Sequence, residues 1–595
     1  MTLITIFAKR NSNFLRIKMF GYWGKYGFGS FAKNDSDSPA LLFENEKVQI
    51  AFSPMPKFSD DKVFADTEKY FFLTDGVIFN IAEMCKSHSA SGLKELIPQL
   101  YEQNGEQFFN EFRGSFSGVF YDKKRDILLI YNDHIGDRMI FFAQADDSFY
   151  FSTDLKQLAQ TLSDSFERKI DDVFVLSMLS YGYSPNCQTL IKSINRVSAG
   201  CYLRISGGKM EGIFYHRFAN NPNQNDEKTN IERLDALFRQ AMGRILDKNK
   251  QYGYRNVMPL SAGLDSRMTV WVARQLTDEP IENVTYSQSG YYDETTPKEI
   301  AKTLGDKMHF KPLDGGDYLK NVDRAVQLTS GLVNYSGAAQ VIDSFDDLSD
   351  KDTIGVVATG MLGDIIVGTG YTQNDINQSF KFGDGALSKK LLPLLQQTAG
   401  NRLFENFPNR ELYYLYVRGF NCANLGSPLV FQEFTESFSP FYDTDLLEFA
   451  YTIPLSQRFG NEIYDRWILS KYPEAARWKH NGERTIGKKM RMVPVMGKSI
   501  PLKDLPARMA MFVLKKTHIH NYDKLESGRS MNPIDSWLAG NQSLREYIDN
   551  YFKANIDSCD KIGMKETISD FYDSGTSFEK LQVISLLAGI KYLNL

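Results

Sequence analysis

The stretch VMPLSAGLDSRM, residues 257–268, predicts a turn from a buried strand into a helix. An apolar run precedes the turn, and the small residues Ser261, Ala262 and Gly263 allow the backbone to turn tightly. Several N–H groups and the N-terminus of the next helix can then converge on a phosphate group. Asp265 inside the turn would repel a bare phosphate, so we expect Mg²⁺ between its carboxylate and the phosphate oxygens. The turn is not a Walker A loop, because no Gly-Lys-Ser/Thr ends it.

Strand-like and helix-like runs alternate around this turn. NVMPL (256–260) precedes a helix from Ser266, NVTYS (283–287) precedes a helix from Thr296, and TIGVVATG (353–360) follows. This alternation predicts a parallel sheet with helices on both faces. The turn then lies where open α/β sheets bind ligands. From about Ser388 onward the pattern is mainly helical.

A polar, Asn-rich segment, HRFANNPNQNDEKTN, predicts a linker over residues 216–230. We therefore expect one domain over 1–215 and another over 231–595. Thr229 and Glu232 fit a capping box at the helix that opens the second domain. In the first domain, Asp75-Gly76, DKKRD (122–126) and Gly207-Gly208 separate short apolar runs, which predicts hairpins in a largely antiparallel sheet.

Composition narrows the class of partner. The chain has 595 residues and a formal net charge of −4, so nothing global favours nucleic acid or an anionic membrane. Its 5 cysteines are scattered without a CxxC pair, which argues against a disulfide framework or a zinc site. No run of about 18 apolar residues occurs, and no signal peptide is recognisable. We expect a cytoplasmic protein that binds small ligands.

Four motifs in order resemble those of the asparagine synthetase family of ATP pyrophosphatases. SAGLDS (261–266) resembles the SGGxDS pyrophosphate loop, with Ala262 for the second glycine. The segment 284–310 resembles the strand and the Asp-Glu pair, here Asp293 and Glu294, that lie beside the nucleotide. ATGMLGDIIVGTGY (358–371) is similar to SGEGxDExxGGY, and ESFSPFYDTDLLEFAYTIP (436–454) to the E-x-R-x-PFLD region, with Phe438 in place of arginine.

The first domain also resembles this family. FRGSFSGVFYDKKRDILLIYNDHIGDRMIFF (112–142) and the segment 179–205 resemble strands of its N-terminal-nucleophile glutaminase domain. The resemblance implies a mixed α/β and α+β fold. An antiparallel β sandwich of the N-terminal nucleophile type is followed by an ATP-pyrophosphatase parallel-sheet domain with a helical C-terminal part.

The resemblance also implies the site residues and cofactors. ATP would bind with its pyrophosphate in the turn, and Asp265 and Asp364 would share Mg²⁺. The implied nucleotide-binding residues are Ser261, Ala262, Gly263, Leu264, Asp265, Ser266, Thr285, Tyr286, Ser287 and Gly360. In the family a lysine after a tryptophan steadies developing charge. Here RWKHNGERTIGKKMR (477–491) offers Lys479 as the candidate catalytic lysine, with His480, Lys488 and Lys489 nearby.

The chain departs from the family at the glutaminase residues. The family's cysteine after the initiator methionine attacks glutamine, with its own α-amino group as base, and this chain has Thr2 there. DGVIFN (75–80) replaces NGEIYN, so Asp75 stands for Asn and Val77 for Glu, and the aspartate of the SDxE pattern falls on Leu93. We predict a scaffold without glutaminase activity. A threonine nucleophile at Thr2 stays an alternative.

By resemblance, a carboxylate would attack the α-phosphorus of ATP, pyrophosphate would leave, and an amine would convert the acyl-adenylate to an amide. The family's acceptor-site glutamate is replaced by Met361. Three hypotheses stay open. One is a ligase that takes ammonia from solution or a partner. A second resembles β-lactam synthetases and lasso-peptide cyclases, which use an amine of a small-molecule or peptide substrate. The third is a nucleotide-binding pseudoenzyme. The resemblance also suggests a homodimer.

Overall fold

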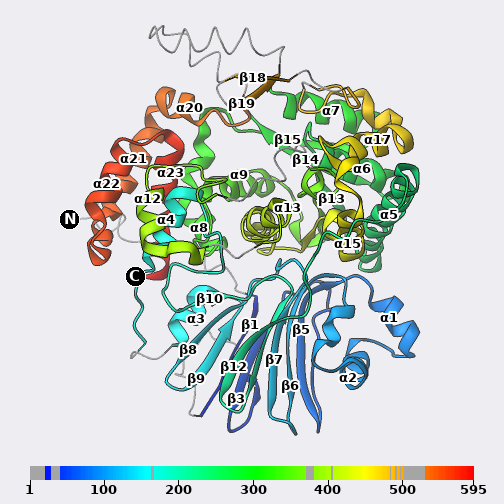
Figure 1. The fold of residues 1–595 in the computed structure, drawn as a ribbon, viewed down its shortest axis with the longest axis vertical. Coiled ribbons are helices and arrows are strands. Elements are labelled where there is room, and N and C mark those ends of the chain that lie inside the picture. Colours follow the sequence, from blue (N-terminus) through cyan, green and yellow to red (C-terminus); the bar gives the residue numbers. More distant parts are fainter. Residues whose placement is uncertain are drawn as a thin grey trace, which may run out of the picture.

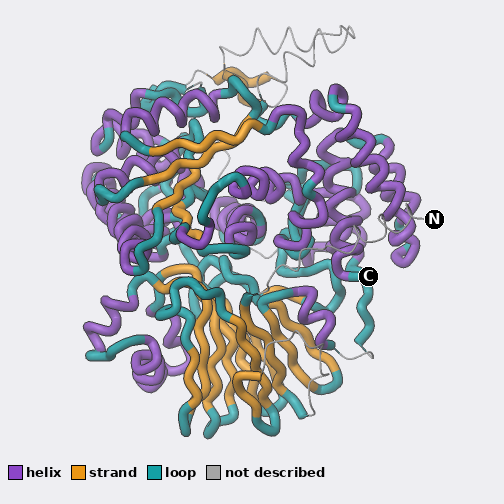
Figure 2. The backbone as a smooth tube through the Cα atoms, turned by 180° about the vertical axis from the view of Figure 1, so that it is seen from behind, coloured by secondary structure: helices purple, strands orange, loops and turns teal. Residues whose placement is uncertain are grey.

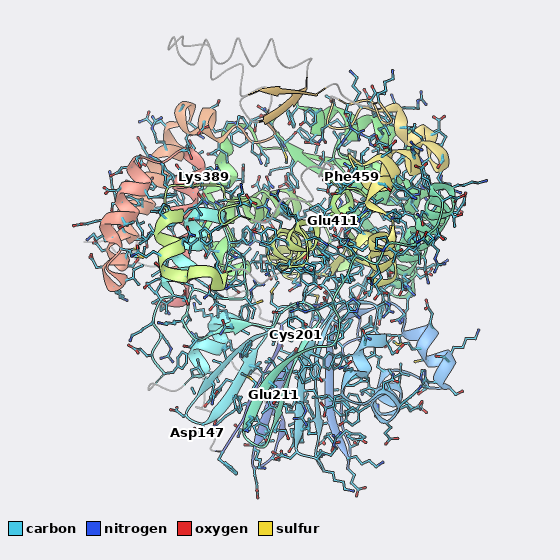
Figure 3. All side chains as sticks on the ribbon, viewed as in Figure 1. Asp147, Cys201, Glu211, Lys389, Glu411 and Phe459 are labelled. Carbon is cyan, nitrogen blue, oxygen red and sulfur yellow. The ribbon has the colours of Figure 1, made fainter. Side chains whose placement is uncertain are left out.

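The structure is a computed structural model that describes residues 20–28, 41–162, 166–369, 381–403, 407–482, 484–488, 492–495, 498–501 and 530–595. Strands fill its lower half and helices dominate its upper half (Figure 1). The reverse view shows the same division (Figure 2). Asp147, in the turn between two strands, lies near the lower end, and Glu411 lies in the middle of the upper half (Figure 3).

The lower half is a sandwich of two antiparallel sheets. Their strand orders are β10-β8-β9-β1-β3-β2 and β12-β11-β7-β6-β5-β4. Buried side chains from both sheets, including Ile50, Leu73, Val119 and Phe151, form the core between them. The strands are β1 Gly21–Tyr26, β2 Leu41–Glu44, β3 Val48–Ser53, β4 Phe64–Asp66, β5 Tyr70–Ile78, β6 Gly114–Asp122, β7 Ile127–Asn132, β8 Phe141–Ala145, β9 Ser148–Ser152, β10 Asn195–Arg196, β11 Cys201–Ser206 and β12 Lys209–Phe214. The predicted antiparallel first half is confirmed.

Two of the three predicted turns are hairpin turns. Residues 123–126 join β6 to β7, and Gly207-Gly208 joins β11 to β12. The Asp75-Gly76 prediction is wrong, because β5 runs through both residues and pairs with β6 along its whole length. Gly76 adopts a φ of +98° there, and a Cβ at this position would lie 2.2 Å from the carbonyl oxygen of Ser115. Glycine therefore allows two strands to approach closely at this point rather than ending a strand.

Helices cover the outer faces of the sandwich. α1 (Ile81–His88) and α2 (Leu93–Asn104) pack on the sheet that holds β5 and β6, through side chains such as Leu96 and Phe120. α3 (Leu155–Thr161) and α4 (Asp172–Tyr181) join a core that continues into the C-terminal helices.

The upper half contains the predicted parallel sheet. β13 (Asn256–Pro259), β14 (Ile281–Ser287) and β15 (Lys307–Pro312) pair in parallel, and β16 (Val357–Ala358) pairs in parallel with β17 (Ser437–Phe438). α5 (Glu227–Gln251), α6 (Leu264–Leu276) and α7 (Tyr292–Leu304) alternate with these strands. The assignment of this half to the ATP-pyrophosphatase class stays a prediction.

The first of these helices begins earlier than the sequence suggested. Asp226 caps α5 by accepting a hydrogen bond from the Thr229 N–H at 2.8 Å. The capping box predicted at Thr229 and Glu232 is therefore wrong, because both residues lie inside the helix. The carboxylate of Asp226 is as good a cap as a threonine hydroxyl, and it precedes the polar turn Glu227 to Asn230.

The rest of the upper half is mainly helical, as predicted. Its helices are α8 Val322–Leu328, α9 Tyr335–Asp346, α10 Gly363–Ile366, α12 Leu392–Ala399, α13 Arg410–Tyr413, α14 Ser427–Phe431, α15 Thr444–Thr452, α16 Leu455–Arg458, α17 Glu462–Lys471, α20 Ile534–Gly540, α21 Gln542–Asn555, α22 Lys565–Asp573 and α23 Ser577–Leu593. Shorter helical segments are η1 Gly105–Glu111, η2 Asp314–Lys320, η3 Lys351–Thr353, η4 Gly400–Leu403, η5 Tyr414–Phe420, η6 Ala423–Leu425, η7 Pro440–Tyr442, η8 Pro473–Arg477 and η10 Ile556–Ile562. β18 (Met492–Val495) and β19 (Lys498–Pro501) form a small hairpin.

Buried ion pairs join the two halves. Glu436, beside β17, pairs with Lys62 at 2.8 Å and also with Arg138. Lys248 on α5 pairs with Asp61 at 2.9 Å. Because these charges are shielded from water, removing one partner would leave the other uncompensated. The boundary at 216–230 stays a prediction, although residues 216–226 carry neither helix nor strand.

None of the 5 cysteines, all of which lie in described parts of the chain, forms a disulfide bond. Among the described residues, no helix is both long and apolar enough to cross a lipid bilayer.

Candidate functional site

A cavity of about 450 Å³ opens at the carboxyl ends of β13 and β14. Its size is typical of small-molecule sites. The predicted turn forms one wall, and α9 and α14 contribute residues to the cavity lining as well. The predicted residues that line it are Ser261, Gly263, Leu264, Asp265, Ser266, Thr285, Tyr286, Gly360 and Asp364. Ala262 and Ser287 are buried beside the cavity and do not line it.

Hydrogen bonds within the turn fix its shape. The Ser261 N–H donates to Ser266 Oγ at 2.9 Å, and the two hydroxyls are also 2.9 Å apart. Asp293 Oδ1 accepts a bond from the Ala262 N–H at 2.7 Å. The Asp293 carboxylate, which also lines the cavity, therefore holds the turn in place. Glu294 pairs with Lys298 at 2.6 Å and does not line the cavity.

The N-terminus of α6 faces the cavity. The helix starts at Leu264, and Gly263 before it provides no side-chain cap. The first N–H groups of a helix lack intrahelical acceptors and carry a partial positive charge, so they attract anions. Gly360 packs directly against this turn, because a Cβ there would lie 2.3 Å from the Ser266 backbone nitrogen. Glycine is therefore required for the close approach of the segment after β16.

Two carboxylates meet in this cavity. Asp265 Oδ2 accepts a hydrogen bond from the Asp364 N–H at 3.1 Å, and Asp265 Oδ1 accepts one from the Tyr464 hydroxyl at 2.9 Å. Burial, together with the charge of Asp364, raises the pKa of Asp265 to about 8. Burial also raises the pKa of Asp364, although its side chain is open to the cavity. A cation between the two would relieve this repulsion, and paired carboxylates suit Mg²⁺.

A buried arginine supports the segment that carries Asp364. Arg458 is fully buried and donates to the carbonyl oxygens of Ile366 and Gly368, both at 2.9 Å. Its charge is balanced by Glu411 at 3.0 Å. These bonds satisfy carbonyl groups at the end of α10, a helix of a single turn, and so fix the position of Asp364.

A second wall of the cavity belongs to the segment that carries His480 and Asn481, and long-range bonds hold it. His480 and Asn481 line the cavity. The Asn481 N–H donates to the Ala262 carbonyl at 3.1 Å, and Arg267 donates to the same carbonyl at 2.8 Å. Arg267 lies within the stretch 257–268, but no local pattern indicates that it contacts residues more than 200 positions away.

Lys479, the predicted catalytic lysine, is exposed, and it is not among the residues that line the cavity. Its carbonyl accepts a bond from Arg267 at 3.0 Å. Lys488 is also exposed, and Lys489 lies outside the described residues. Burial, with Arg484 and Arg267 nearby, lowers the pKa of His480 to about 4. The imidazole is therefore neutral near pH 7.

Met361 lies beside apolar side chains in the cavity. Its sulfur is 3.8 Å from Ser427 Oγ on α14, and its carbonyl accepts a bond from Ser439 at 3.0 Å. Phe345 and Phe431 also line the cavity, with ring centroids 4.8 Å apart. This wall is apolar at the position where the family resemblance places an acceptor-site glutamate.

A smaller cavity of about 120 Å³ lies between the two halves. Phe20, the residue before β1, lines it together with Asp75 and Arg138, whose charged groups are 4.0 Å apart. Val77 and Leu93 are buried in hydrophobic cores. Thr2 lies outside the described residues. Phe20, which directly precedes β1, thus lines the same cavity as Asp75.

Comparisons with known proteins find one domain family and several relatives. Residues 58–218 match the glutamine amidotransferase domain family. Glutamine-hydrolyzing asparagine synthetase 1 of Bacillus subtilis (strain 168) is 23% identical over 274 residues, which is 44% of this chain and 42% of the relative. Putative glutamine-hydrolyzing asparagine synthetase 1 of Methanocaldococcus jannaschii is 21% identical over 408 residues, or 66% of each chain. The chain thus spans about two fifths of the length of the first of these relatives and about two thirds of the second.

Among solved structures, glutamine phosphoribosylpyrophosphate amidotransferase from B. subtilis, complexed with ADP and GMP, gives a TM-score of 0.23 at 11% identity. That likeness covers 46% of this chain and 61% of the other. The amidotransferase domain match and the curated relatives together support a relationship of this chain to the asparagine synthetase family.

Proposed function

We propose that the chain is an ATP-dependent carbon–nitrogen ligase that adenylates a substrate carboxylate and then forms an amide. The substrate oxygen attacks the α-phosphorus, pyrophosphate leaves, and an amine displaces AMP from the acyl-adenylate. The observation that carries this proposal is the pair Asp265 and Asp364 in one cavity at the N-terminus of α6.

The turn and the helix supply the polyphosphate end of the site. The first N–H groups of α6, at Leu264 to Ser266, would bind the β- and γ-phosphates. Val284 and Tyr286 on β14 offer an apolar surface for the adenine ring. Holding the nucleotide at both ends would leave the α-phosphorus accessible to the carboxylate, and such positioning is most of what phosphoryl-transfer sites do.

Asp265 and Asp364 would hold Mg²⁺. Their donor atoms fit the ion, since Mg²⁺ takes one or two carboxylates and completes its octahedron with water and phosphate oxygens. Burial and the charge of Asp364 raise the pKa of Asp265 to about 8, so a bound cation would stabilise its ionised form. When bound, the ion neutralises phosphate charge and stabilises the leaving pyrophosphate. Tyr464 keeps the Asp265 carboxylate aimed at the cavity.

We further propose that the first domain does not hydrolyse glutamine. Phe20 has no nucleophilic atom, and Val77 has no polar group to hold an amide. The Phe20 side chain lines the smaller cavity, and the Val77 side chain is buried in a hydrophobic core. The amine would then come from ammonia, or from the substrate itself in an intramolecular cyclisation. The apolar wall at Met361 is compatible with either source.

A pseudoenzyme that only binds nucleotide is the alternative of another class. The paired carboxylates count against it, because two adjacent carboxylates repel each other and a bound cation would relieve that repulsion. The carboxylate substrate would be a small molecule or a peptide.

Nucleotide product analysis tests the proposal. Purified protein would be incubated with Mg-ATP and a panel of carboxylates, each with ammonium or glutamine, and AMP and pyrophosphate would be measured. We expect AMP that depends on a carboxylate and is lost in Asp265→Ala. Asp278→Ala is the matched control, since Asp278 is exposed after α6. AMP formation that survives in Asp265→Ala would refute the metal role, and a wild type that binds no ATP would refute the ligase.

A further inference from the structure

A buried arginine joins the two sides of the cavity. Arg267 on α6 is 0% exposed, and its guanidinium donates to four backbone carbonyls. The acceptors are Ala262 at 2.8 Å, Ala475 at 3.1 Å, Trp478 at 2.8 Å and Lys479 at 3.0 Å. Burial lowers its pKa to about 10, so the group stays charged near pH 7. Burying a charge is costly unless the charge is paired or hydrogen-bonded, and here the four carbonyl groups supply the hydrogen bonds.

The positions of these carbonyls show what the arginine does. Ala262 lies in the turn at residues 261–266, whereas the other three acceptors lie in or just after η8, directly before His480. The Asn481 N–H also donates to Ala262, so one carbonyl receives bonds from both Arg267 and the opposite wall. Asn481 itself adopts a left-handed φ of 49°, a conformation that needs support from its surroundings.

We propose that Arg267 is a positioning residue that holds His480 and Asn481 against the turn, so that these two side chains complete the binding site for the polyphosphate group of the nucleotide. The inference rests on the proposed function, because it assigns the cavity to a nucleotide. His480 and Asn481 line the cavity on this side, whereas Lys479, the candidate that the resemblance offered, does not.

The chemistry of the wall fits this role. The Asn481 amide and a neutral imidazole each offer N–H donors to phosphate oxygens. The charges of Arg484, Arg267 and Asp465 act on His480. Asp465 in turn is paired with Arg484 and accepts a bond from the Gly487 N–H at 3.0 Å, so Arg484 is not free to replace Arg267.

Binding of Mg-pyrophosphate and Mg-ATP, measured by titration calorimetry, tests the inference. Arg267→Met removes the donors and keeps the side-chain length, and we expect roughly tenfold weaker binding, as for the loss of one charge-assisted hydrogen bond. Arg267→Lys keeps the charge and reaches fewer carbonyls, so its binding should be intermediate. Arg274→Met on the same helix removes bonds to Asp306 and Thr277 outside the cavity and should bind as the wild type does.

Two further measurements separate positioning from general destabilisation. Hydrogen exchange of residues 475–482 should rise in both Arg267 variants while the sandwich stays protected. In a double-mutant cycle, Arg267→Met should cost little once His480→Ala and Asn481→Ala are present.

Additive losses in the cycle, or unchanged exchange at 475–482, would overturn the inference even if Arg267→Met folds poorly, because Arg267→Lys supplies the same readouts. A wild type that binds neither ligand would instead refute the proposed function.

Discussion

Tyr464→Phe removes one hydroxyl and tests whether Asp265 holds a cation. Tyr464 is fully buried, and its hydroxyl donates to Asp265 Oδ1 at 2.9 Å. A hydrogen bond to a charged group contributes about 1.5–3 kcal/mol. At about 1.4 kcal/mol per pKa unit, its loss should raise the pKa of Asp265 by about one to two units. Since metal binding requires the ionised carboxylate, the apparent affinity for Mg²⁺ at pH 7 should fall about tenfold or more.

The assay is the Mg²⁺ dependence of ATP binding between pH 6 and pH 9. The deficit of Tyr464→Phe should be largest at low pH and shrink as Asp265 ionises in both proteins. Tyr472→Phe is a matched control, because the Tyr472 hydroxyl donates to Asp235 at 2.5 Å, outside the cavity. If the pH profile of Tyr464→Phe coincides with that of the wild type, Asp265 is not the metal ligand that we propose.

Three further predictions concern stability and packing. Without metal, Asp265→Asn should be more stable than the wild type at pH 8 and about as stable at pH 4. The folded-state pKa of Asp265 is raised from 3.8 to about 8, so the stability that its protonated form contributes is present below pH 4 and is lost as pH rises to 8. Thermal unfolding of both proteins across this pH range checks the prediction. Gly360→Ala should abolish nucleotide binding without unfolding the protein, since the added Cβ would lie 2.3 Å from the Ser266 nitrogen. Calorimetry measures the nucleotide binding and circular dichroism the fold, and normal binding by the variant would contradict the prediction. Glu436→Gln should lower the free energy of unfolding in urea by about 3–5 kcal/mol, as for a broken buried ion pair, whereas Glu102→Gln at an exposed pair should change it little.

Local sequence patterns predicted the residues that line the cavity better than the contacts that hold those residues in place. The turn at 261–266 and the strands around it follow from small residues and hydrophobic alternation within a few positions. Asp364, from a second motif, lies in the same cavity because parallel strands bring their carboxyl ends to one edge. The prediction at Asp75-Gly76 failed because a pairing partner, β6, overrode the turn propensity of the dipeptide.

Contacts between distant segments could not be predicted. Arg267 reaches residues 475–479 through bonds that span more than 200 positions, and no spacing rule connects them. Thr2 lies outside the described residues. Phe20 and Asp75 line one cavity, and this follows from the sandwich and not from any local sequence pattern.

The amidotransferase domain supports the cavity even if it carries no chemistry. Its Lys62 and Arg138 both pair with Glu436, which would otherwise be a buried, uncompensated charge. The Glu436 carbonyl accepts a bond from the Val357 N–H at 2.8 Å, and two residues on, the Phe438 carbonyl accepts one from Thr359 at 3.0 Å. Gly360 follows directly and packs against the turn that we assign to pyrophosphate. A first domain that did not hydrolyse glutamine, as we propose, would therefore still be needed for the charges that hold β17 in place.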